Sequence, residues 1–231
     1  MVDTHKQIGG PSDAKTGVKK DVKTQENARN EIRSKIKQQR KALELSALES
    51  AGANLLTNCI QFINRANSIA GYRAMMGEIP LHPIFDYCHK NNIVTLLPIM
   101  REKSLMFAPF DVTTTFNIRQ YGIQEPDVSE AYWLTPEQLD VVLVPLVAFD
   151  TTCNRIGMGG GFYDRSFEFR KKGSAPPTLV GVAHALQQVD NVYAQHWDVA
   201  LDFVATNAGV LTNTTDYTNS ENSTSSKRRG S

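Results

Sequence analysis

The chain has 231 residues, a formal net charge of +1 and three cysteines. Its length suits one domain with a sizeable core, and its near-neutral charge gives no global field that would attract nucleic acid or a membrane surface. The odd number and wide spacing of Cys59, Cys88 and Cys153 argue against a disulfide framework and a zinc site. No apolar run approaches the roughly 20 residues that span a bilayer, and the N-terminal residues lack the apolar core of a signal peptide. We therefore expect a cytoplasmic protein that binds neither nucleic acid nor membrane.

The two ends of the chain differ in composition from its middle. Residues 1–24 are polar, rich in Gly, Lys, Asp and Thr, and show no periodicity, which predicts a disordered leader. Residues 212–231 are rich in Asn, Ser and Thr and predict a disordered tail. Residues 25–211 are expected to form the folded domain.

Two helices are predicted at the start of this domain. Apolar residues at near-helical spacing predict the first from about Glu26 to Glu44. Its surface is basic, and a solvated charged face is one explanation for such a run. The second helix is expected to begin at Ser46, because Ser46-Ala-Leu-Glu49 has the pattern of a capping box.

Short apolar runs predict the strands of a sheet, and helical patterns lie between them. The run at 105–110 contains Pro109, which disfavours a central position and predicts an edge strand. Further helices are predicted near 81–88 and over 163–172. This alternation predicts a three-layer α/β domain with a mainly parallel sheet, helices on both faces and ligands at the carboxyl ends of the strands. The predicted strands are 69–72, 93–97, 105–110, 141–145, 178–183 and 203–205.

A glycine-rich stretch, DTTCNRIGMGGGFYDR, runs from Asp150 to Arg165 directly after one buried strand. Glycine permits positive φ, so successive backbone N–H groups can turn inward and form an anion-binding nest. A helix that begins near Tyr163 would add its N-terminal dipole. The stretch is neither a dinucleotide fingerprint nor a P-loop, because Phe162 and Asp164 stand where the former needs glycine and no Gly-Lys-Ser/Thr triplet follows. A flexible or tightly packed turn is the alternative, but the charged residues around the glycines favour a phosphate-binding loop.

The same stretch closely resembles the signature of the 5-formyltetrahydrofolate cyclo-ligases, also called 5,10-methenyltetrahydrofolate synthetases. The resemblance extends from about Ala28 to Val210. The further matching segments are the basic helix at 29–40, Gly77-Glu78, 121–126, 183–187 and Trp197-Asp198.

The resemblance implies an enzyme that converts 5-formyltetrahydrofolate and ATP into 5,10-methenyltetrahydrofolate, ADP and phosphate, with Mg²⁺ as the cofactor. It assigns Arg155 and Tyr163 to catalysis and Asp164 and Asp198 to the metal. The implied ATP-binding residues are Arg29, Arg33, Arg155, Gly157, Met158, Gly159, Gly160, Gly161, Phe162 and Tyr163. The implied folate-binding residues are Arg33, Arg73, Glu78, Gly159, Gly160 and Phe162.

The chain departs from the family pattern in two places. It has Arg73-Ala74 and Pro80-Leu81 where relatives often have Leu-Ser and Asp-Thr, and it has Gly160 and Phe162 where some relatives have lysine and tyrosine. Two other functions therefore stay open. One is a phosphosugar or CoA-ester enzyme on a related scaffold, and the other is a non-catalytic folate- or nucleotide-binding regulator. We expect a monomer, and we expect His184 to be structural because no motif supplies it with a carboxylate partner.

Overall fold

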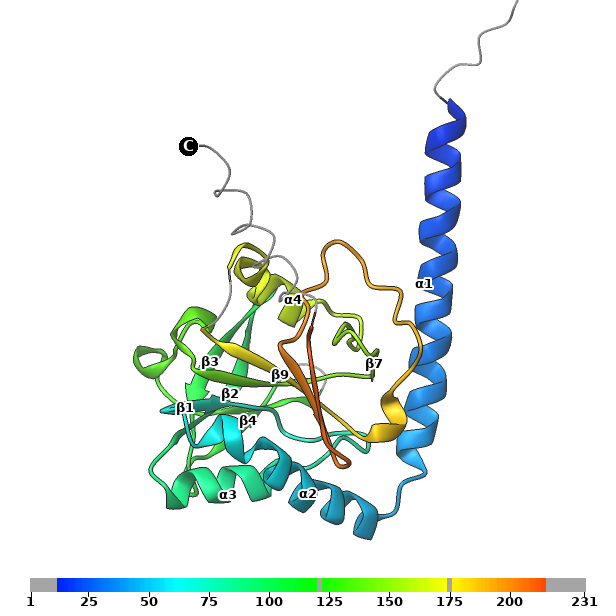
Figure 1. Cartoon of the computed structure of the whole chain (residues 1–231). Coiled ribbons are helices and arrows are strands. Elements are labelled where there is room, and N and C mark those ends of the chain that lie inside the picture. Colours follow the sequence, from blue (N-terminus) through cyan, green and yellow to red (C-terminus); the bar gives the residue numbers. More distant parts are fainter. Residues whose placement is uncertain (1–11, 120–121, 174–175, 215–231) are drawn as a thin grey trace, which may run out of the picture.

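The computed structural model describes residues 12–119, 122–173 and 176–214 (Figure 1). A seven-stranded sheet has the order β11-β10-β9-β6-β1-β2-β3. Its strands are β1 (Ser68–Ala70), β2 (Val94–Arg101), β3 (Ser104–Pro109), β6 (Val141–Pro145), β9 (Thr178–Ala183), β10 (Phe203–Thr206) and β11 (Val210–Thr212). Two small hairpins pair β4 (Phe116–Ile118) with β5 (Gln124–Pro126) and β7 (Ala148–Phe149) with β8 (Arg155–Ile156).

The sheet is mainly parallel, as predicted. Strands β2, β1, β6, β9 and β10 run parallel to one another, while β3 and β11 pair antiparallel at the two edges. The Pro109-containing run is therefore an edge strand. Strands β1, β6 and β9 are buried along nearly their whole length, which explains their continuous apolar sequences, because strands covered on both faces need no polar alternation.

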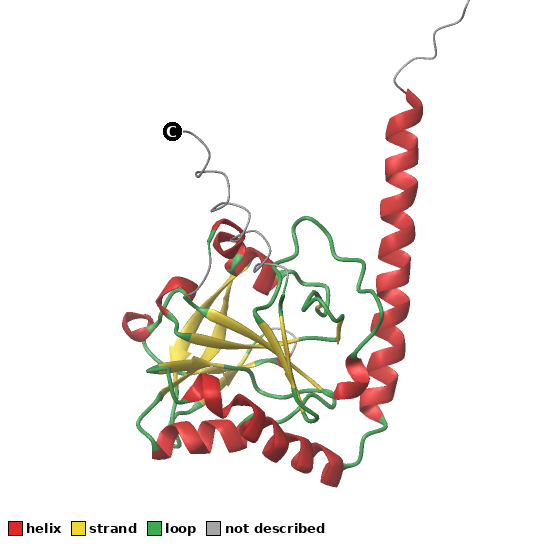
Figure 2. Ribbon diagram, viewed as in Figure 1, coloured by secondary structure: helices red, strands yellow, loops and turns green. Residues whose placement is uncertain are grey.

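Helices and loops cover the two faces of the sheet unequally (Figure 2). Helices α2 (Leu45–Ile63) and α3 (His82–Lys90) pack on one face, where Leu55, Ile63 and Ile84 are fully buried. On the other face, a core that includes Phe107, Phe149, Phe167 and Leu201 lies under α4 (Phe162–Ser166), a 3-10 helix at Glu168–Lys172 and loops. Helix α1 (Ser12–Lys41) runs along one side of the domain, and its N-terminal part extends beyond it (Figure 1).

The strand order reverses between β1 and β6. From β1 the chain continues to β2 on one side, whereas from β6 it continues to β9 and β10 on the other. In open α/β sheets, ligands bind where the strand order reverses in this way. The loop after β1 carries Glu78, and the chain after β6 leads through β7 and β8 to the glycine stretch. His184, which follows β9, reaches the first of these loops, with Nε2 3.0 Å from the Gly77 carbonyl oxygen.

The boundaries of α1 and of the domain differ from the prediction. Helix α1 begins at Ser12 and not near Glu26, so it includes residues 12–24 of the predicted leader; residues 1–11 lie outside the described part. This segment contains Ala, Lys and Gln, which favour helix, and it only has to extend a helix already anchored further along. At the other end, Asn213 is buried, so the domain continues two residues past the expected limit of 211. The rest of the predicted tail, from residue 215, also lies outside the described part.

Two predicted helix boundaries are wrong. The N-cap of α2 is Glu44, and its side chain makes no capping hydrogen bond, so Ser46 does not begin a capping box. The single helix predicted over 163–172 is divided: α4 ends at Ser166, and a 3-10 helix follows. Phe167, between them, is only 1% exposed and belongs to the core. We attribute the division to its burial, since packing overrides local helical propensity.

Replacing Gly181 by Ala should destabilise the fold through its packing in the core. A Cβ there would lie 2.4 Å from Leu201 Cδ1 and 2.8 Å from Leu146 Cδ2, and both leucines are buried. Overpacking of this kind costs about 1–3 kcal/mol, measurable as a lower free energy of unfolding in urea. Gly173→Ala is the control, because nothing lies within 4 Å of its Cβ position. Equal unfolding curves for the two variants would contradict the packing described for β9.

Candidate active site

A charged cavity of about 390 Å³ lies between α1, the glycine stretch and the loop before β10. This volume is within the range of small-molecule sites. Three arginines and four carboxylates face it, so the site is built for ionic contacts. The lining residues are Glu26, Arg29, Arg33, Gly157, Gly159, Gly160, Gly161, Asp164, Arg165, Glu168, Trp197 and Asp198.

The glycine loop has the left-handed backbone expected of a nest at two of its four glycines. Gly159 has φ of 107° and Gly161 has φ of 63°, conformations that L side chains rarely adopt. Space is open around the Cβ positions of Gly157 and Gly159, so a ligand can approach the backbone there. Helix α4 has only five residues, so the dipole expected from a long helix at this point is weak.

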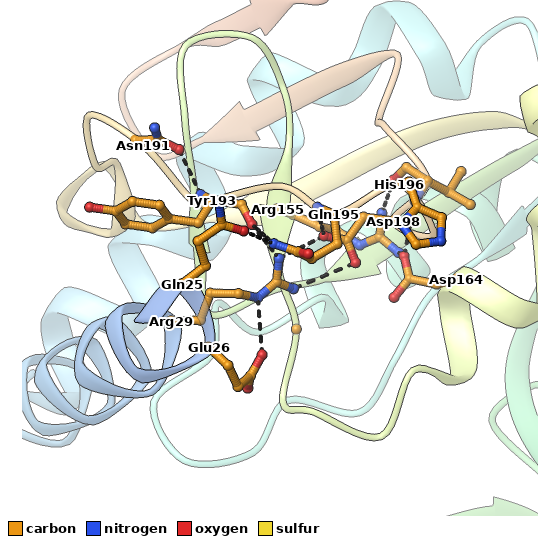
Figure 3. A network of polar contacts seen from close by, with 12 residues as sticks. Gln25, Glu26, Arg29, Arg155, Asp164, Asn191, Tyr193, Gln195, His196 and Asp198 are labelled. Atoms are coloured by element: carbon orange, nitrogen blue, oxygen red, sulfur yellow. Dashed lines mark hydrogen bonds and ion pairs between the residues drawn. The ribbon is translucent and has the colours of Figure 1, made fainter. Parts of the chain in front are cut away.

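Arg29 is buried and holds Asp198 (Figure 3). Its Nη1 donates to Asp198 Oδ2 at 2.7 Å and to the Tyr193 carbonyl oxygen at 3.0 Å. Asp198 Oδ2 also accepts the backbone N–H of Gln195 at 2.9 Å. Arg29, predicted to bind ATP, and Asp198, predicted to bind the metal, thus lie together and form an ion pair with each other.

Arg155 and Asp164 form a second such pair. The buried Arg155 donates from Nη2 to Asp164 Oδ1 at 2.7 Å and from Nη1 to the Val199 carbonyl oxygen. Asp164 Oδ1 also accepts the Val199 N–H at 3.1 Å. The Asp164 side chain is still 25% exposed and lines the cavity. Arg155 itself does not line the cavity, and its observed contacts orient the aspartate.

Arg33 and Arg165 bind the glycine loop from opposite ends. Arg33 Nε donates to the Gly157 carbonyl oxygen at 3.0 Å, and its Nη1 pairs with Glu26 at 3.0 Å. Arg165 Nη2 donates to the Gly160 carbonyl oxygen at 2.8 Å. Arg165 was not predicted to belong to the site. Its position at the end of the glycine-rich stretch could have indicated that it lies there.

Glu78 and Tyr163 are not among the residues that line the cavity, but they lie close enough to interact electrostatically with each other. The Glu78 side chain is 13% exposed, and its Oε2 accepts the Met75 N–H at 3.0 Å. Burial raises the pKa of Glu78, while the Met75 N–H and Arg40 act to lower it. Burial also raises the pKa of the Tyr163 hydroxyl well above its usual value, and the negative charge of Glu78 raises it further. Tyr163 is therefore a neutral hydroxyl, a hydrogen-bond donor rather than a base at ordinary pH.

The remaining predicted residues are not gathered in this cavity. The Arg73 guanidinium lies over the Phe116 ring, 4.4 Å from its centroid, and Arg73 lines a separate cavity of about 340 Å³ beside α3. Phe162 packs against the core, and Met158 is half exposed. Among residues 12–119, 122–173 and 176–214, no group of three or more His, Cys, Asp or Glu is arranged to hold a metal.

The three cysteines lie in the core. Cys59, Cys88 and Cys153 are buried free thiols, and burial raises their pKa values to about 12, 11 and 11 respectively. They are therefore poor nucleophiles.

No helix in the described part of the chain has both the length and the apolar character needed to cross a bilayer.

The fold and site together define a mainly parallel α/β protein whose left-handed glycine loop lines a charged cavity. Residues 25–207 match the 5-formyltetrahydrofolate cyclo-ligase family. The match covers most of the chain, and the chain belongs to this family, whose members are ligases.

Individual relatives agree with this assignment. The 5-formyltetrahydrofolate cyclo-ligase of Haemophilus influenzae is 34% identical over 178 residues, which cover 75% of this chain and 94% of the relative. That of Escherichia coli K12 is 30% identical over 176 residues, with 74% and 96% covered. The NMR structure of Aquifex aeolicus 5,10-methenyltetrahydrofolate synthetase superposes with a TM-score of 0.69 at 26% identity, covering 80% of this chain and 93% of that one.

Breaking the Arg29–Asp198 pair should destabilise the protein. Both side chains are less than one-tenth exposed, so Asp198→Asn or Arg29→Met removes the charge partner of a buried group, at a cost of about 3 kcal/mol or more. Because one pair can be broken only once, the double variant should lose less than the sum of the single losses in urea unfolding. Arg101→Gln, in an exposed pair with Glu130, is the control and should cost less than about 1 kcal/mol. Additive losses at Arg29 and Asp198 would show that the pair contributes nothing.

Proposed function

We propose that this chain converts 5-formyltetrahydrofolate into 5,10-methenyltetrahydrofolate by transferring the γ-phosphoryl group of ATP to the formyl oxygen. The observation that carries the proposal is the meeting, at one cavity, of a left-handed glycine loop, the arginines of α1 and an aspartate oriented by a buried arginine. Family membership supports the overall conversion and ATP as the co-substrate.

The chemistry suits these groups. A formamide oxygen is a poor leaving group, so N10 of the folate cannot displace it directly. The γ-phosphoryl group is transferred to that oxygen and ADP leaves. N10 then attacks the formyl carbon and loses its proton to solvent, and the C–O bond breaks with release of phosphate, which leaves the methenyl bridge. Such a transfer depends on positioning and charge neutralisation more than on a protein nucleophile. The buried cysteines, with their raised pKa values, are not needed as nucleophiles.

We place the phosphates of ATP against the glycine loop. Backbone N–H groups at 159–161 would face the phosphate oxygens, and Arg33 is the arginine of α1 nearest to them through its contact with Gly157. Arg29 and Arg155 would then act through the aspartates that they hold. This assignment keeps all three arginines in the ATP site but gives them different tasks.

The charge of the lining favours a cation with the nucleotide. Four carboxylates and three arginines face the cavity, so a polyphosphate would meet a net negative wall unless a cation accompanied it. Mg²⁺ is bound by oxygen ligands, commonly one or two carboxylates together with substrate phosphates. Asp164 fits this need, because its side chain lines the cavity and the hydrogen bonds given for it go to Oδ1. Asp198 would share its carboxylate between Arg29 and the cation. When bound, Mg²⁺ would neutralise charge on the transferred phosphoryl group.

We place the pterin of the folate at Glu78, beside Phe162 and Tyr163. The ring N–H and amino group of a pterin form a paired donor face, which a carboxylate can accept. The Tyr163 hydroxyl, kept neutral by burial and by Glu78, can donate to the substrate. Arg73 would meet the folate only from the side of the second cavity.

The two other functions have distinct requirements. A phosphosugar or CoA-ester enzyme would need a carboxylate that acts as nucleophile or base in the glycine loop, and pairing with Arg155 makes Asp164 weaker in both roles. A non-catalytic regulator would bind without turnover. Incubation with 5-formyltetrahydrofolate, ATP and Mg²⁺, followed by measurement of methenyl absorbance, distinguishes both from the cyclo-ligase. Absence of the methenyl product would contradict the proposed activity.

We further propose that the protein is a monomer in the cytoplasm, a location that suits the three free thiols.

Asp164→Asn should depress kcat strongly and raise the Mg²⁺ concentration needed for activity, because the amide lacks the charge that would hold the cation. A loss of about 10²-fold or more is expected for removal of such an electrostatic contact. Steady-state rates across a Mg²⁺ titration test this, and adding Asp198→Asn should cost less than the sum of the two single losses. Asp202→Asn is a matched control, since Asp202 is also 25% exposed and 2.7 Å from a buried arginine. Normal Mg²⁺ dependence in Asp164→Asn would remove Asp164 from the metal site.

Arg33→Ala should weaken ATP binding while the protein stays folded, because α1 is anchored independently by Ile36, Arg29 and Arg40. Loss of a charge-assisted contact predicts a rise in the KM for ATP of about ten- to hundredfold. The exposed Lys35 supplies the control variant Lys35→Ala. An unchanged KM in Arg33→Ala would mean that Arg33 only shapes the loop.

A further inference from the structure

Arg40 is a buried cation to which neither the sequence motifs nor the proposed reaction gives a role. It lies in the last turn of α1 and is 1% exposed. Its Nη1 donates to the Leu146 carbonyl oxygen at 3.3 Å. Within the described residues, its Nε and Nη2 have no hydrogen-bond partner. An incompletely satisfied buried guanidinium destabilises a fold, so its presence calls for a reason other than stability.

The loop that carries Glu78 is packed directly against this arginine. Arg40 Nη1 lies 3.9 Å from Glu78 Oε1. Gly77 has φ of 77°, and a Cβ on it would lie 2.5 Å from the Arg40 carbonyl oxygen. From the opposite side, His184 Nε2 lies 3.0 Å from the Gly77 carbonyl oxygen. The loop is thus held between the end of α1 and the residue that follows β9.

We propose that Arg40 is a positioning residue for the folate substrate, which keeps Glu78 anionic and aimed at the pterin. The inference rests on the proposed folate contact of Glu78. A carboxylate accepts hydrogen bonds on both oxygens, whereas a protonated acid would turn an O–H toward the donor face of the pterin. Arg40 therefore acts on the substrate through Glu78 and need not touch it.

The groups that face Glu78 come from four elements of the fold. They are Arg40 at the end of α1, Tyr72 after β1, Tyr163 in α4 and, across Gly77, His184 after β9. Burial raises the pKa of both tyrosines, so they are neutral. Burial lowers the pKa of His184, and Arg40 lowers it further, so the imidazole is neutral near pH 7. Of these four groups, Arg40 is the cation.

Ionisation of Glu78 should make kcat/KM depend on pH. Burial raises the pKa of the Glu78 carboxyl, and Arg40 offsets part of this rise. The active anion is lost as the pH falls through that pKa. Without the guanidinium the pKa rises further, so the acid limb of kcat/KM for 5-formyltetrahydrofolate should move toward higher pH.

The first test compares Arg40→Met with the wild-type protein. We expect the KM for 5-formyltetrahydrofolate at neutral pH to rise about tenfold, the scale of one charge-assisted hydrogen bond. The acid limb of kcat/KM should move to higher pH, and the KM for ATP should stay unchanged. Arg40→Lys keeps a cation and should keep the limb in place. Arg170→Met is the matched control: Arg170 is also buried, has an unpartnered Nε within the described residues and pairs with Asp202, away from Glu78. Arg170→Met should lower the stability of the protein and leave the acid limb of kcat/KM at the same pH.

The second test separates this inference from the proposed role of Glu78. If Glu78→Gln leaves the folate KM unchanged, the pterin contact itself is wrong. If Glu78→Gln raises that KM while Arg40→Met leaves both the KM and the acid limb unchanged, the inference about Arg40 is overturned. In the Glu78→Gln background, Arg40→Met should add no further change, because its target is already neutral. Should Arg40→Met fail to fold, Arg40→Gln keeps a donor for Leu146 and must show the same displaced limb for the inference to stand.

Discussion

The geometry of the site depends on three arginines along one helix. Arg29, Arg33 and Arg40 are separated by four and seven residues, a spacing that places them on one face of α1. Each reaches a different part of the carboxyl edge of the sheet: the loop before β10 through Asp198, the glycine loop through Gly157, and the chain after β6 through Leu146. The planar guanidinium, with donors in a fixed fork, suits this task better than an ammonium group. Helix α1 therefore fixes the relative positions of loops that the sheet alone would leave independent.

The same constraint explains why charges in the site are paired before any ligand binds. Arg29 holds Asp198 and Arg155 holds Asp164, and in both pairs the arginine is the more buried member. A buried guanidinium without its carboxylate would be costly, so the pairs are required by the fold. They also hold the aspartates at fixed points on the cavity wall. Groups that are already oriented need no reorganisation when charge develops in a transition state.

Much of the fold could be predicted because its signals are local. Strands β6 and β9 are continuous apolar runs, and the glycine loop has a composition that few other structures require. The helix over 163–172 could not be predicted correctly, because its division depends on the burial of Phe167 by distant residues. The pairing of Arg29 with Asp198 could not be predicted either, since the two residues lie 169 positions apart. Arg40 resembles its neighbours Lys37 and Lys41 in sequence, and only tertiary packing shows that it is buried while they are not.

The short length of α4 changes how an anion can be held. A five-residue helix offers little dipole, so the backbone of the glycine loop must supply most of the attraction through its N–H groups. Carbonyl oxygens in the same loop would oppose an anion if they faced it. Two of them, at Gly157 and Gly160, are each bound by a guanidinium, from Arg33 and Arg165 respectively. These contacts draw negative ends of the peptide dipoles toward cations, so that the N–H groups of the loop would be free to face an anion in the proposed site. In the proposed site, the arginines would therefore assist anion binding twice, by their own charge and by the loop conformation that they stabilise.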